Sequence, residues 1–494
     1  MTATNRASPT LGGERNPSIR WALASLSLAM LLSSLGTSIA NVGLPTMAEA
    51  FNASFQNVQW IVLAYLLAIT TLIVSVGRLG DIIGRRRLLL AGIFVFTVAS
   101  ILCGMAPTLW LLVAARAVQG LGAAVMMALA LAFVGETVSK EKTGSAMGLL
   151  GTMSAIGTAL GPSLGGVLIA VLGWRAIFLV NLPLGILAFG LAYRYLPVDR
   201  QGAKAERASF DMLGTLLLAL TLAAYALAMT IGRGSFGWRN IALLVATAVG
   251  VGLFVRAQAR AASPLIRLTM FRDPTLSAGF AMSALVSTVL MATLVVGPFY
   301  LSRALGLDAV LVGIVLSIGP LAVALTGVQV GRIVDQVGAH GTIVVGLIAI
   351  ATGSLLLGML RSSLTGYIAS LVVITVGYAL FQTANNTAVM RDVHPDQRGV
   401  ISGLLNLSRN LGLITGASAM GAVFAFASAV TDITTAHPES VASGMRGTFA
   451  VSAILAVIAL VIAVGSRAIT ATAAVPTTFH DARRREPRSE HKKS

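Results

Sequence analysis

A short charged turn between two long uncharged segments limits the folds open to this chain more than any other feature. The turn covers residues 77–87 and reads GRLGDIIGRRR. No charged side chain occurs in residues 58–76 before it or in residues 88–105 after it. Each segment has about the length of a membrane-crossing helix, which needs roughly 20 apolar residues. The pattern predicts two spanning helices joined by a tight hairpin, and the four arginines place that hairpin on the cytoplasmic side.

A degenerate copy of this turn lies in the other half of the chain. The glycine, arginine, aspartate and glycine of the first turn recur 254 residues later as Gly331, Arg332, Asp335 and Gly338. Glycine at such positions lets helix ends approach closely and lets the chain turn. The constant offset predicts a parallel repeat of two similar halves.

The composition is that of an all-α polytopic membrane protein. The chain is 56% hydrophobic and only 11% charged, with a mean hydropathy of +0.86, whereas a soluble protein carries about 25% charged residues. Long apolar segments between short polar loops favour a helix bundle over a transmembrane barrel, whose segments alternate. We predict fourteen spans, at residues 21–44, 58–77, 88–106, 109–134, 143–171, 176–197, 211–230, 240–258, 275–302, 308–331, 340–360, 364–389, 399–427 and 446–466.

The net charge of +17 allows a nucleic-acid partner as one interpretation. The basic residues, however, gather in alternate loops and in the C-terminal tail, as membrane orientation requires. We therefore expect no nucleic acid and a multi-pass protein of a bacterial inner membrane, with both termini cytoplasmic. Cys103 is the only cysteine, so the sequence contains no intrachain disulfide and no cysteine metal motif. We expect no cofactor and no metal.

The turn at 77–87 resembles the signature loop between helices two and three of the major facilitator superfamily. The copy at 331–338 resembles the equivalent loop in that family's second half. The resemblance implies two six-helix halves with substrate bound between them near mid-membrane. Fourteen spans are similar to the family's drug:proton antiporter branch. The expected division is a cytoplasmic tail at 1–20, a six-helix half at 21–197, a linker with two extra helices at 198–274, a second half at 275–466 and a basic tail at 467–494.

The charged turns are expected to form an inner gate. By resemblance, Asp81 helps to latch this gate against the start of helix eleven near Gly399, where a positive helix dipole would favour a carboxylate. The basic cluster would pair with Asp81 in one state and release it in another. The inner-gate set is Gly77, Arg78, Gly80, Asp81, Gly84, Arg85, Arg86 and Asp335.

Residues 35–45 (LGTSIANVGLP) resemble the end of helix one in the fourteen-helix antiporters, where the second position is usually aspartate. This chain has Gly36 there. A carboxylate inside the membrane is costly and is kept for ions, protons or cationic substrates. Its absence weakens the inference to cationic drugs and removes the most obvious proton carrier. Thr37 and Asn41 stay as substrate-cavity candidates, with helix–helix hydrogen bonding as the alternative.

Residues 116–123 resemble the family's R-x-x-Q-G motif in helix four. An arginine in mid-helix is expensive in lipid, so Arg116 must face protein or water. The resemblance implies a part in proton coupling, and a structural charge paired with backbone carbonyls is the alternative. Gln119 is a further cavity candidate. Asp81 and Glu136 are the fallback proton sites, because no carboxylate falls at a predicted membrane centre.

Helix five carries the run GTALGPSLGG at residues 157–166, which resembles a motif that this superfamily associates with antiporters. Glycines four residues apart share one helix face and let two helices touch, while proline kinks or loosens a helix. A tight helix–helix contact is the plain alternative, and a close, kinked interface also suits a rocking motion. The motif residues are Gly157, Gly161, Pro162, Gly165 and Gly166.

In helix eleven, residues 406–412 resemble the family's N-x-x-R-x-x-G pattern and place Arg409 inside the membrane, with its partner unknown. An intramembrane charge is functional by default. Two buried arginines without a central acid predict neutral, zwitterionic or anionic substrates rather than dications. Further cavity candidates are Gln329, Gln382 and Asn386.

Together these features predict a transporter that exports drugs or other small organic compounds by alternating access, driven by protons. A narrow-specificity metabolite exporter and an uncoupled facilitator of the same fold are the alternatives. A membrane enzyme is disfavoured, because the sequence contains no HExxH, GxSxG or Walker motif. A sensor on this fold is disfavoured by the intact first turn. The expected partners are a small organic substrate, protons and the bilayer, and we expect a monomer.

Overall fold

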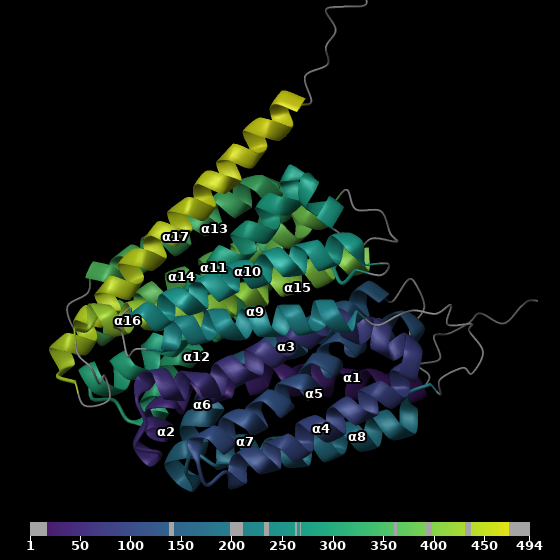
Figure 1. Ribbon diagram of the computed structural model, residues 1–494, viewed down its shortest axis with the longest axis horizontal. Coiled ribbons are helices and arrows are strands. Elements are labelled where there is room, and N and C mark those ends of the chain that lie inside the picture. The colour runs from purple at the N-terminus through teal and green to yellow at the C-terminus, as the bar shows by residue number, and fades with distance from the viewer. Residues whose placement is uncertain are drawn as a thin grey trace, which may run out of the picture.

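The protein is described from a computed structural model. The structure describes residues 17–137, 143–197, 211–231, 237–261, 264–266, 268–359, 363–391, 398–429 and 436–473. Within these ranges the side chains of Arg78, Asp81, Glu136 and Asp335 lie outside the description. The secondary structure of the described ranges is helical (Figure 1).

The first helices form one packed group, the N-terminal group, drawn in purple to blue in Figure 1. Within it α1 packs against α6 and α8, and α5 packs against α3 and α4. The short helix α2 was not predicted; it follows Gly43 and has Pro45 near its start, where proline is well tolerated. The helices are α1 (Pro17–Val42), α2 (Leu44–Ala50), α3 (Phe55–Ile83), α4 (Arg85–Met105), α5 (Leu109–Thr137), α6 (Thr143–Leu172), α7 (Ala176–Leu179) and α8 (Asn181–Tyr195).

The last helices form a second group, the C-terminal group, drawn in teal to yellow. Within it α13 packs against α14 and α17, and α11 packs against α15 and α17. Its helices are α11 (Pro274–Phe299), η3 (Tyr300–Ala304), α12 (Ala309–Val337), α13 (Ala339–Met359), α14 (Leu364–Met390), α15 (Arg398–Thr415), η5 (Gly416–Met420), α16 (Gly421–Ala427) and α17 (Pro438–Ala473). The predicted span at 399–427 thus consists of α15, a π-helical turn (η5) and α16.

Aspartates and a serine set the starts of several helices. Asp273 accepts hydrogen bonds from the backbone N–H groups of Thr275 and Leu276, and Pro274 occupies the first turn of α11. Asp308 caps α12 and Ser363 caps α14 in the same way. Each cap satisfies a backbone donor that the helix leaves without a partner. The caps place these carboxylates at helix ends rather than inside the spans.

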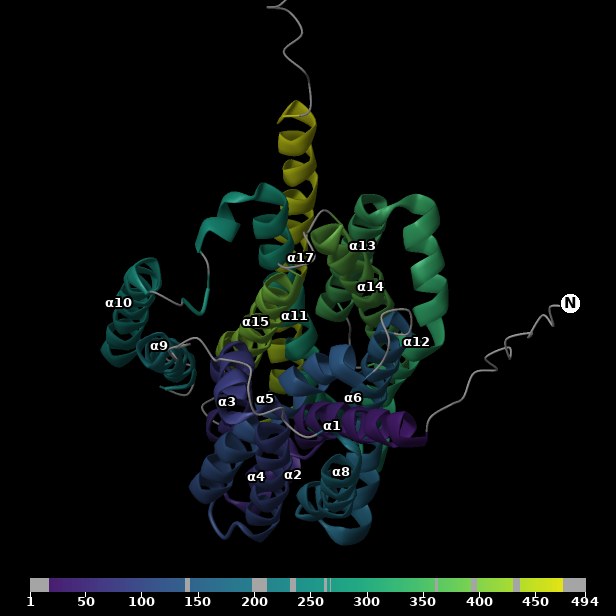
Figure 2. The ribbon, with the colours of Figure 1, turned by 90° about the vertical axis from the view of Figure 1, so that its right-hand side faces the viewer.

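A helical pair, α9 (Met212–Thr230) and α10 (Trp238–Arg260), lies beside the two groups (Figure 2). α9 packs alongside α3. The Ser75 and Thr215 hydroxyls are 3.1 Å apart, and Trp60 Nε1 donates to Thr230 Oγ1 at 3.1 Å. α10 packs on α9, and most of its apolar side chains are exposed. A long apolar helix with so little buried surface suits contact with lipid.

Thirteen helices of the described chain are long and apolar enough to cross a membrane. They match the predicted spans to within a few residues at most ends, but the last span begins at Pro438 rather than 446, the fifth begins at Leu149 rather than 143, and the predicted span at 308–331 is not among them. There α12 runs over Ala309–Val337, but its described apolar stretch is the shorter Ala309–Val323. A multi-pass helical protein is confirmed, and the count of fourteen stays a prediction.

The two groups meet at the end of the bundle opposite the start of α1 and the end of α17, which we call the closed end. There Gly166 of α6 lies against α12, so a Cβ at Gly166 would stand 2.5 Å from the Ala309 carbonyl oxygen. Toward the other end, which we call the termini end, the start of α1 and the end of α17 lie far apart (Figure 1). The groups therefore close at one end and separate toward the other.

The repeated turns adopt the same glycine-dependent conformation. Gly84 joins α3 to α4 with φ of 99°, and Gly338 joins α12 to α13 with φ of 82°. A side chain rarely adopts such backbone angles, because its Cβ would clash with the chain. One glycine therefore makes each turn, 254 residues apart, as the sequence predicts.

Replacing either turn glycine should strain the protein. We expect Gly84→Ala or Gly338→Ala to lower the free energy of unfolding by ~1–3 kcal/mol, the usual cost of a strained backbone position. Gly151→Ala is the control, because Gly151 lies inside α6 in open space. Thermal unfolding in detergent measures the effect, and equal unfolding temperatures for Gly84→Ala and Gly151→Ala would contradict it.

Candidate functional site

A buried arginine joins four helices of the N-terminal group. Arg116 on α5 is 0% exposed. Its Nε donates to the Ile61 carbonyl of α3 at 3.0 Å, and one terminal nitrogen donates to the Gly36 carbonyl of α1 at 3.0 Å. The other terminal nitrogen donates to Gln119 Oε1, and Gln119 Nε2 donates to the Ser100 hydroxyl of α4 at 2.7 Å. Among the described residues no carboxylate pairs with this charge.

Aromatic rings complete the surroundings of Arg116. Its guanidinium carbon lies 4.1 Å from the ring centre of Tyr65 and 5.8 Å from that of Phe178. The Tyr65 hydroxyl donates to the Ser33 carbonyl of α1 at 2.8 Å, which fixes the ring. A cation over an aromatic face contributes more when both are desolvated, as they are here. Carbonyl dipoles and rings thus stabilise a cation that would otherwise be costly to bury.

Small residues allow α5 to bring Arg116 to this place. A Cβ at Gly120 would stand 2.5 Å from the Tyr65 carbonyl oxygen, and a Cβ at Gly122 would stand 2.7 Å from the backbone nitrogen of Phe96. These contacts hold α5 close to α3 and α4, as small residues do at membrane helix interfaces. The spacing of arginine, glutamine and glycine in the motif therefore has a packing reason.

Gly36 contributes its carbonyl instead of a carboxylate. A Cβ at this position would lie 2.9 Å from the Tyr65 hydroxyl oxygen and 3.4 Å from the Phe96 ring. The place that an aspartate side chain would need is therefore filled by Tyr65 and Phe96. Tyr65 was not singled out from the sequence. The sequence signal for such a residue is the combination of Arg116 with Gly36. A buried arginine that lacks an acidic partner needs another group, such as an aromatic ring, to stabilise its charge.

The polar candidates of α1 and α5 form their hydrogen bonds inside the N-terminal group. The Asn41 amide donates to the carbonyls of Thr37 and Ser38, and its Oδ1 is buried without a hydrogen bond among the described residues. The Thr37 hydroxyl donates to the Ser33 carbonyl. Gln119 is 0% exposed and connects Arg116 to α4. Asn41 and Gln119 are therefore buried in the bundle, and Thr37 is half-buried.

Arg409 of α15 has different surroundings from Arg116. It is half-buried, and its Nε is buried without a hydrogen bond to any described atom. Its helix position is about 160° from Leu411, which faces α9, and hence Arg409 faces away from the helical pair. The two arginines therefore differ: each guanidinium nitrogen of Arg116 donates inside the N-terminal group, whereas the buried Nε of Arg409 has no hydrogen bond among the described residues.

The other candidates of the C-terminal group lie on α12 and α14. Gln329 and Asn386 are exposed, and Gln382 is half-buried. Their neighbour Asn385 is buried and donates to the Gly279 carbonyl at 3.1 Å. Exposure leaves Gln329, Gln382 and Asn386 accessible to solvent or ligand, but the described contacts bring none of them to Arg116.

The charged turn at 77–87 is only partly within the described chain. The side chains of Arg78, Asp81 and Asp335, and any detail at Gly77, lie outside the description, as do the Glu136 side chain and the surroundings of Gly399. Gly80 is buried against Arg85, whose Cγ would lie 3.2 Å from an added Cβ. Arg86 donates to the Tyr193 carbonyl of α8 and lies 5.4 Å from the Tyr193 ring centre. Arg86 therefore fastens the turn to its own group.

The glycine motif of α6 serves two interfaces. A Cβ at Gly157 would stand 2.5 Å from the Leu31 carbonyl oxygen, and a Cβ at Gly165 would stand 2.7 Å from Val42 of the same helix, α1. Gly161 lies against Ser38 of α1. Gly166 and Pro162 instead face α12, where Gly313 packs on the Pro162 carbonyl. α6 runs unbroken through Pro162, so the motif forms a close, small-residue contact both within and between the groups.

Several contacts that were not predicted from the sequence join the two groups at the closed end. Arg303 forms an ion pair with Glu49, and Gln59 Nε2 donates to the Ala417 carbonyl of η5 at 3.0 Å. Phe55 packs edge-on against Phe299 and Phe424, with ring centres 4.7 Å and 5.3 Å away. Each contact joins the N-terminal to the C-terminal group. No motif marked them, because an exposed ion pair and a core aromatic cluster are common in any chain.

The fold and these motifs agree with a known family. Residues 26–417 match the Major Facilitator Superfamily. The chain belongs to the Major Facilitator Superfamily. Membership makes it a membrane transporter rather than an enzyme.

Several curated members of the superfamily are similar along most of the chain. The multidrug resistance protein Stp of Mycobacterium tuberculosis is 34% identical over 410 residues, covering 82% of this chain and 75% of Stp. The multidrug efflux pump LfrA of Mycolicibacterium smegmatis is 30% identical, covering 83% and 82%. The riboflavin transporter RibZ of Clostridioides difficile is 29% identical, covering 82% and 88%. The superfamily relatives thus include pumps for drugs and a transporter for a vitamin.

Solved structures of superfamily members share the fold. A bacterial homologue of the human lysosomal transporter Spinster, in an inward-facing and unoccupied conformation, aligns with a TM-score of 0.66 at 16% identity, covering 92% of this chain and 98% of that one. The human organic anion transporter TETRAN aligns with a TM-score of 0.62 at 17% identity, covering 91% and 100%. At such low identity the likeness concerns architecture alone.

The contact between Gly36 and Tyr65 generates a first prediction for the site. We expect Gly36→Ala to destabilise the protein by ~1–3 kcal/mol through overpacking. Tyr65→Phe removes the atom that the new methyl group meets, so the double variant should lose less than the sum of the two single variants. Thermal unfolding of all four proteins gives this coupling. Strict additivity would show that Tyr65 does not limit the space at Gly36.

The ion pair at the closed end generates a second prediction. Because the Glu49 side chain is 61% exposed, the pair should contribute no more than ~1 kcal/mol. Arg303→Gln should therefore raise the modification rate of a cysteine at the buried Ser54 (Ser54→Cys) by up to ~5-fold. The swap of Glu49→Arg with Arg303→Glu should restore the slow rate.

Arg175→Gln is the matched control for the closed end, since Arg175 lies at the same end and stacks on Trp174 of its own group, with 4.4 Å to the ring. It should leave the rate unchanged. A rate that rises equally in Arg175→Gln and Arg303→Gln would assign the effect to surface charge rather than to the ion pair.

Proposed function

We propose that this transporter exports drugs or other small organic compounds by alternating access, coupled to protons. The observation that carries the proposal is the arrangement of the two groups, which are closed by Glu49–Arg303 and the Phe55 cluster at one end and separate toward the termini end (Figure 1). The charge distribution favours cytoplasmic termini. The conformation is then open to the cytoplasm, where an exporter takes up its substrate.

The branch of the superfamily is part of the proposal. α9 and α10 lie between the two groups in the sequence and beside them in space (Figure 2). With α12 counted as a span over its full length, the chain has the fourteen helices of the drug:proton antiporter branch. The similarity to Stp and LfrA, both described as multidrug proteins, supports this assignment.

The expected substrate class rests on the difference between the two intramembrane arginines. The buried Nε of Arg409 has no hydrogen bond among the described residues, whereas each guanidinium nitrogen of Arg116 already donates inside the N-terminal group. A guanidinium with free N–H groups favours carboxylate, phosphate or carbonyl oxygens. Neutral, zwitterionic and anionic compounds are therefore the expected substrates, with Arg409 as a contact and Gln382 and Asn386 as further polar contacts.

Proton coupling needs a group that gains and loses a proton during the cycle. The candidates are Asp81 and Glu136 near helix ends, with Arg116 as a buried charge that a nearby proton change would influence. Gly36 supplies a carbonyl where related antiporters carry an acid, and this observation favours a second candidate function. That function is uncoupled facilitation, or export of one metabolite, on the same fold.

Efflux measurements with and without a proton gradient test the two functions. Cells that express the protein are loaded with a panel of anionic, zwitterionic, neutral and dicationic compounds. We expect efflux of the first three classes and its loss when a protonophore removes the gradient. Efflux that persists down a substrate gradient would replace antiport by facilitation. Efflux restricted to dications would contradict the assigned role of Arg409.

A substitution of Arg409 sharpens this test. We expect Arg409→Gln to reduce anionic efflux by about ten- to a hundredfold, because losing a charge-assisted hydrogen bond costs ~1.5–3 kcal/mol. Neutral compounds should be affected less. Arg409→Lys should keep part of the anionic efflux. Arg194→Gln, an exposed arginine at the end of α8, is the control. An equal loss for all substrates, with unchanged expression, would assign Arg409 to the conformational change rather than to binding.

A further inference from the structure

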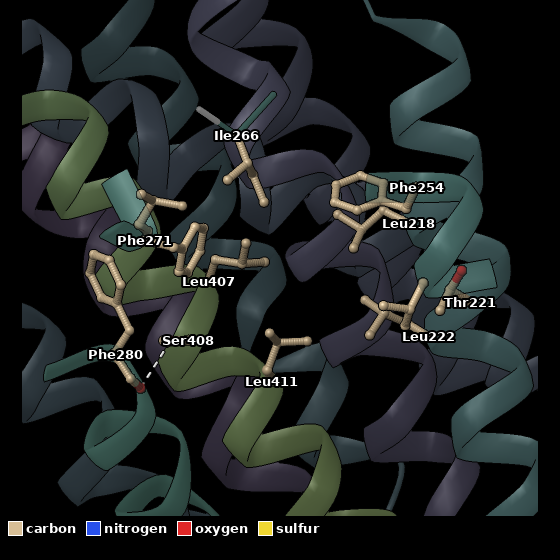
Figure 3. Close-up of a pocket in the computed structure, with 12 residues that line it drawn as sticks. Leu218, Thr221, Leu222, Phe254, Ile266, Phe271, Phe280, Leu407, Ser408 and Leu411 are labelled. Carbon is tan, nitrogen blue, oxygen red and sulfur yellow. Dashed lines mark hydrogen bonds between the residues drawn. The ribbon is translucent and has the colours of Figure 1, made fainter. Parts of the chain in front are cut away.

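An apolar pocket of about 240 Å³ separates the helical pair from the C-terminal group (Figure 3). Leu218 and Leu222 of α9 face it from one side, and Leu407 and Leu411 of α15 from the other. Phe254 of α10 closes it on the side of the pair. The Ser408 hydroxyl, one of the few polar groups in the lining, already donates to the Phe280 carbonyl at 3.0 Å. The pocket therefore offers apolar contact and little hydrogen bonding.

A polar mouth adjoins the pocket toward the termini end. A neighbouring hollow of about 450 Å³ shares Ile266 with the pocket and is lined by Gln258 and Arg272. Gln258 is buried: its Nε2 donates to Asp211 Oδ2 at 2.7 Å, and its Oε1 accepts from the Ile266 backbone at 3.0 Å. These bonds hold the end of α10, the start of α9 and the following segment together. The mouth is therefore a fixed part of the fold.

The charges at the mouth favour a phosphate. Arg272 is exposed and forms no hydrogen bond or ion pair with any described residue. The nearby acids are engaged as helix caps: Asp211 accepts from the Gly214 backbone and from Gln258, and Asp273 accepts from the first turn of α11. Among the described residues at the mouth, Arg272 is thus the charged side chain that is available to a ligand.

We propose that the pocket and its mouth hold one membrane phospholipid, with an acyl chain among Leu218, Leu222, Leu407 and Leu411 and the headgroup phosphate at Arg272. Each methylene group of a buried acyl chain strengthens binding by about fourfold. Water is a poor occupant, because the lining gives it few hydrogen bonds. Arginine binds phosphate through paired donors. The surrounding bilayer supplies such a molecule at high concentration.

The position of the pocket gives the bound lipid a second role. The helical pair is attached to α3 of the N-terminal group through Ser75–Thr215 and Trp60–Thr230, whereas Leu407 and Leu411 belong to the C-terminal group. Toward the closed end Tyr225 of α9 already reaches α15 and η5. The lipid chain therefore acts as a wedge between α9 and α15 at the termini end. A ligand that fits one conformation better shifts the population toward it.

Photoreactive lipid tests the binding step. The full-length protein is placed in vesicles of phosphatidylethanolamine and phosphatidylglycerol that contain a phospholipid with a diazirine in its acyl chain. After irradiation, adducts are located by digestion and mass spectrometry. Residues 404–411 are the diagnostic segment, because Leu404, Leu405 and Leu407 are buried and do not meet bulk lipid. We expect adducts there.

Two leucines of α9 give a matched pair of variants. Leu222 lines the pocket and is 7% exposed, while Leu220 points outward and is 59% exposed. Leu222→Trp fills the pocket and should lower the adducts at 404–411 by about tenfold, since losing two buried methylene groups accounts for that factor. Leu220→Trp should not lower them. An unlabelled 404–411 segment, or equal labelling in both variants, overturns the proposal.

The headgroup contact and the identity of the occupant have their own tests. Arg272→Gln should reduce the adducts, and Arg256→Gln, an exposed arginine of α10 outside the lining, should not. Unchanged adducts in Arg272→Gln overturn the phosphate contact. Competition by an exported compound would make the pocket a substrate entrance instead of a lipid site. Unfolding temperatures near that of the parent exclude misfolding as the cause.

The wedge rests on the proposed alternating access, whereas the binding step does not. Spin labels at the exposed Ile83 of α3 and Val337 of α12 report the separation of the groups at the termini end. In the same vesicles, Arg272→Gln should shift the distance distribution toward shorter values than Arg256→Gln. Identical distributions overturn the wedge and leave the lipid site in place. Failure of efflux with positive labelling would overturn the transport proposal alone.

Discussion

The burial of the Arg116 charge without a carboxylate determines how the N-terminal group is built. In a low-dielectric interior such a cation is costly unless fixed dipoles surround it. The carbonyls of Gly36 and Ile61, the Gln119 amide and the Tyr65 ring supply those dipoles from α1, α3 and α5, and Gln119 in turn donates to Ser100 of α4. Removing one of these groups would leave a donor of the charge unsatisfied. The arginine thereby fixes the relative positions of α1, α3, α4 and α5.

Small residues and a few side-chain contacts determine how the two groups meet. Within a bilayer, helices gain little from apolar burial and associate through close packing. Gly157 and Gly165 bring α6 onto α1 inside one group, whereas Gly166 and Gly313 bring α6 onto α12 across the groups. The contact across the groups lies toward the closed end. The helical pair packs against α3 through α9, and the apolar pocket lies between the pair and α15.

Much of the fold could be predicted because the bilayer restricts the choices. Backbone polar groups must be satisfied internally in lipid, so long uncharged segments become helices. Gly84 and Gly338 could be predicted as turns, since their spacing repeats and a turn of one residue needs glycine. The site was less accessible. Arg116 could be identified by its charge, but its partners come from residues 55 and 80 positions away, and nothing in the pattern of Ile61 or Gly36 marks a carbonyl as an acceptor.

The sequence by itself determined a polytopic helical membrane protein, its repeat, its charged turns and its superfamily, because hydrophobic length and short motifs are local properties of a chain. The tertiary structure decided what no local pattern contains. It assigned Arg116 to carbonyls and rings, left Arg409 with donor capacity and joined Glu49 to Arg303. It also placed Leu222 opposite Leu407 across a pocket. These pairings join distant parts of the chain, and they depend on how whole helices pack.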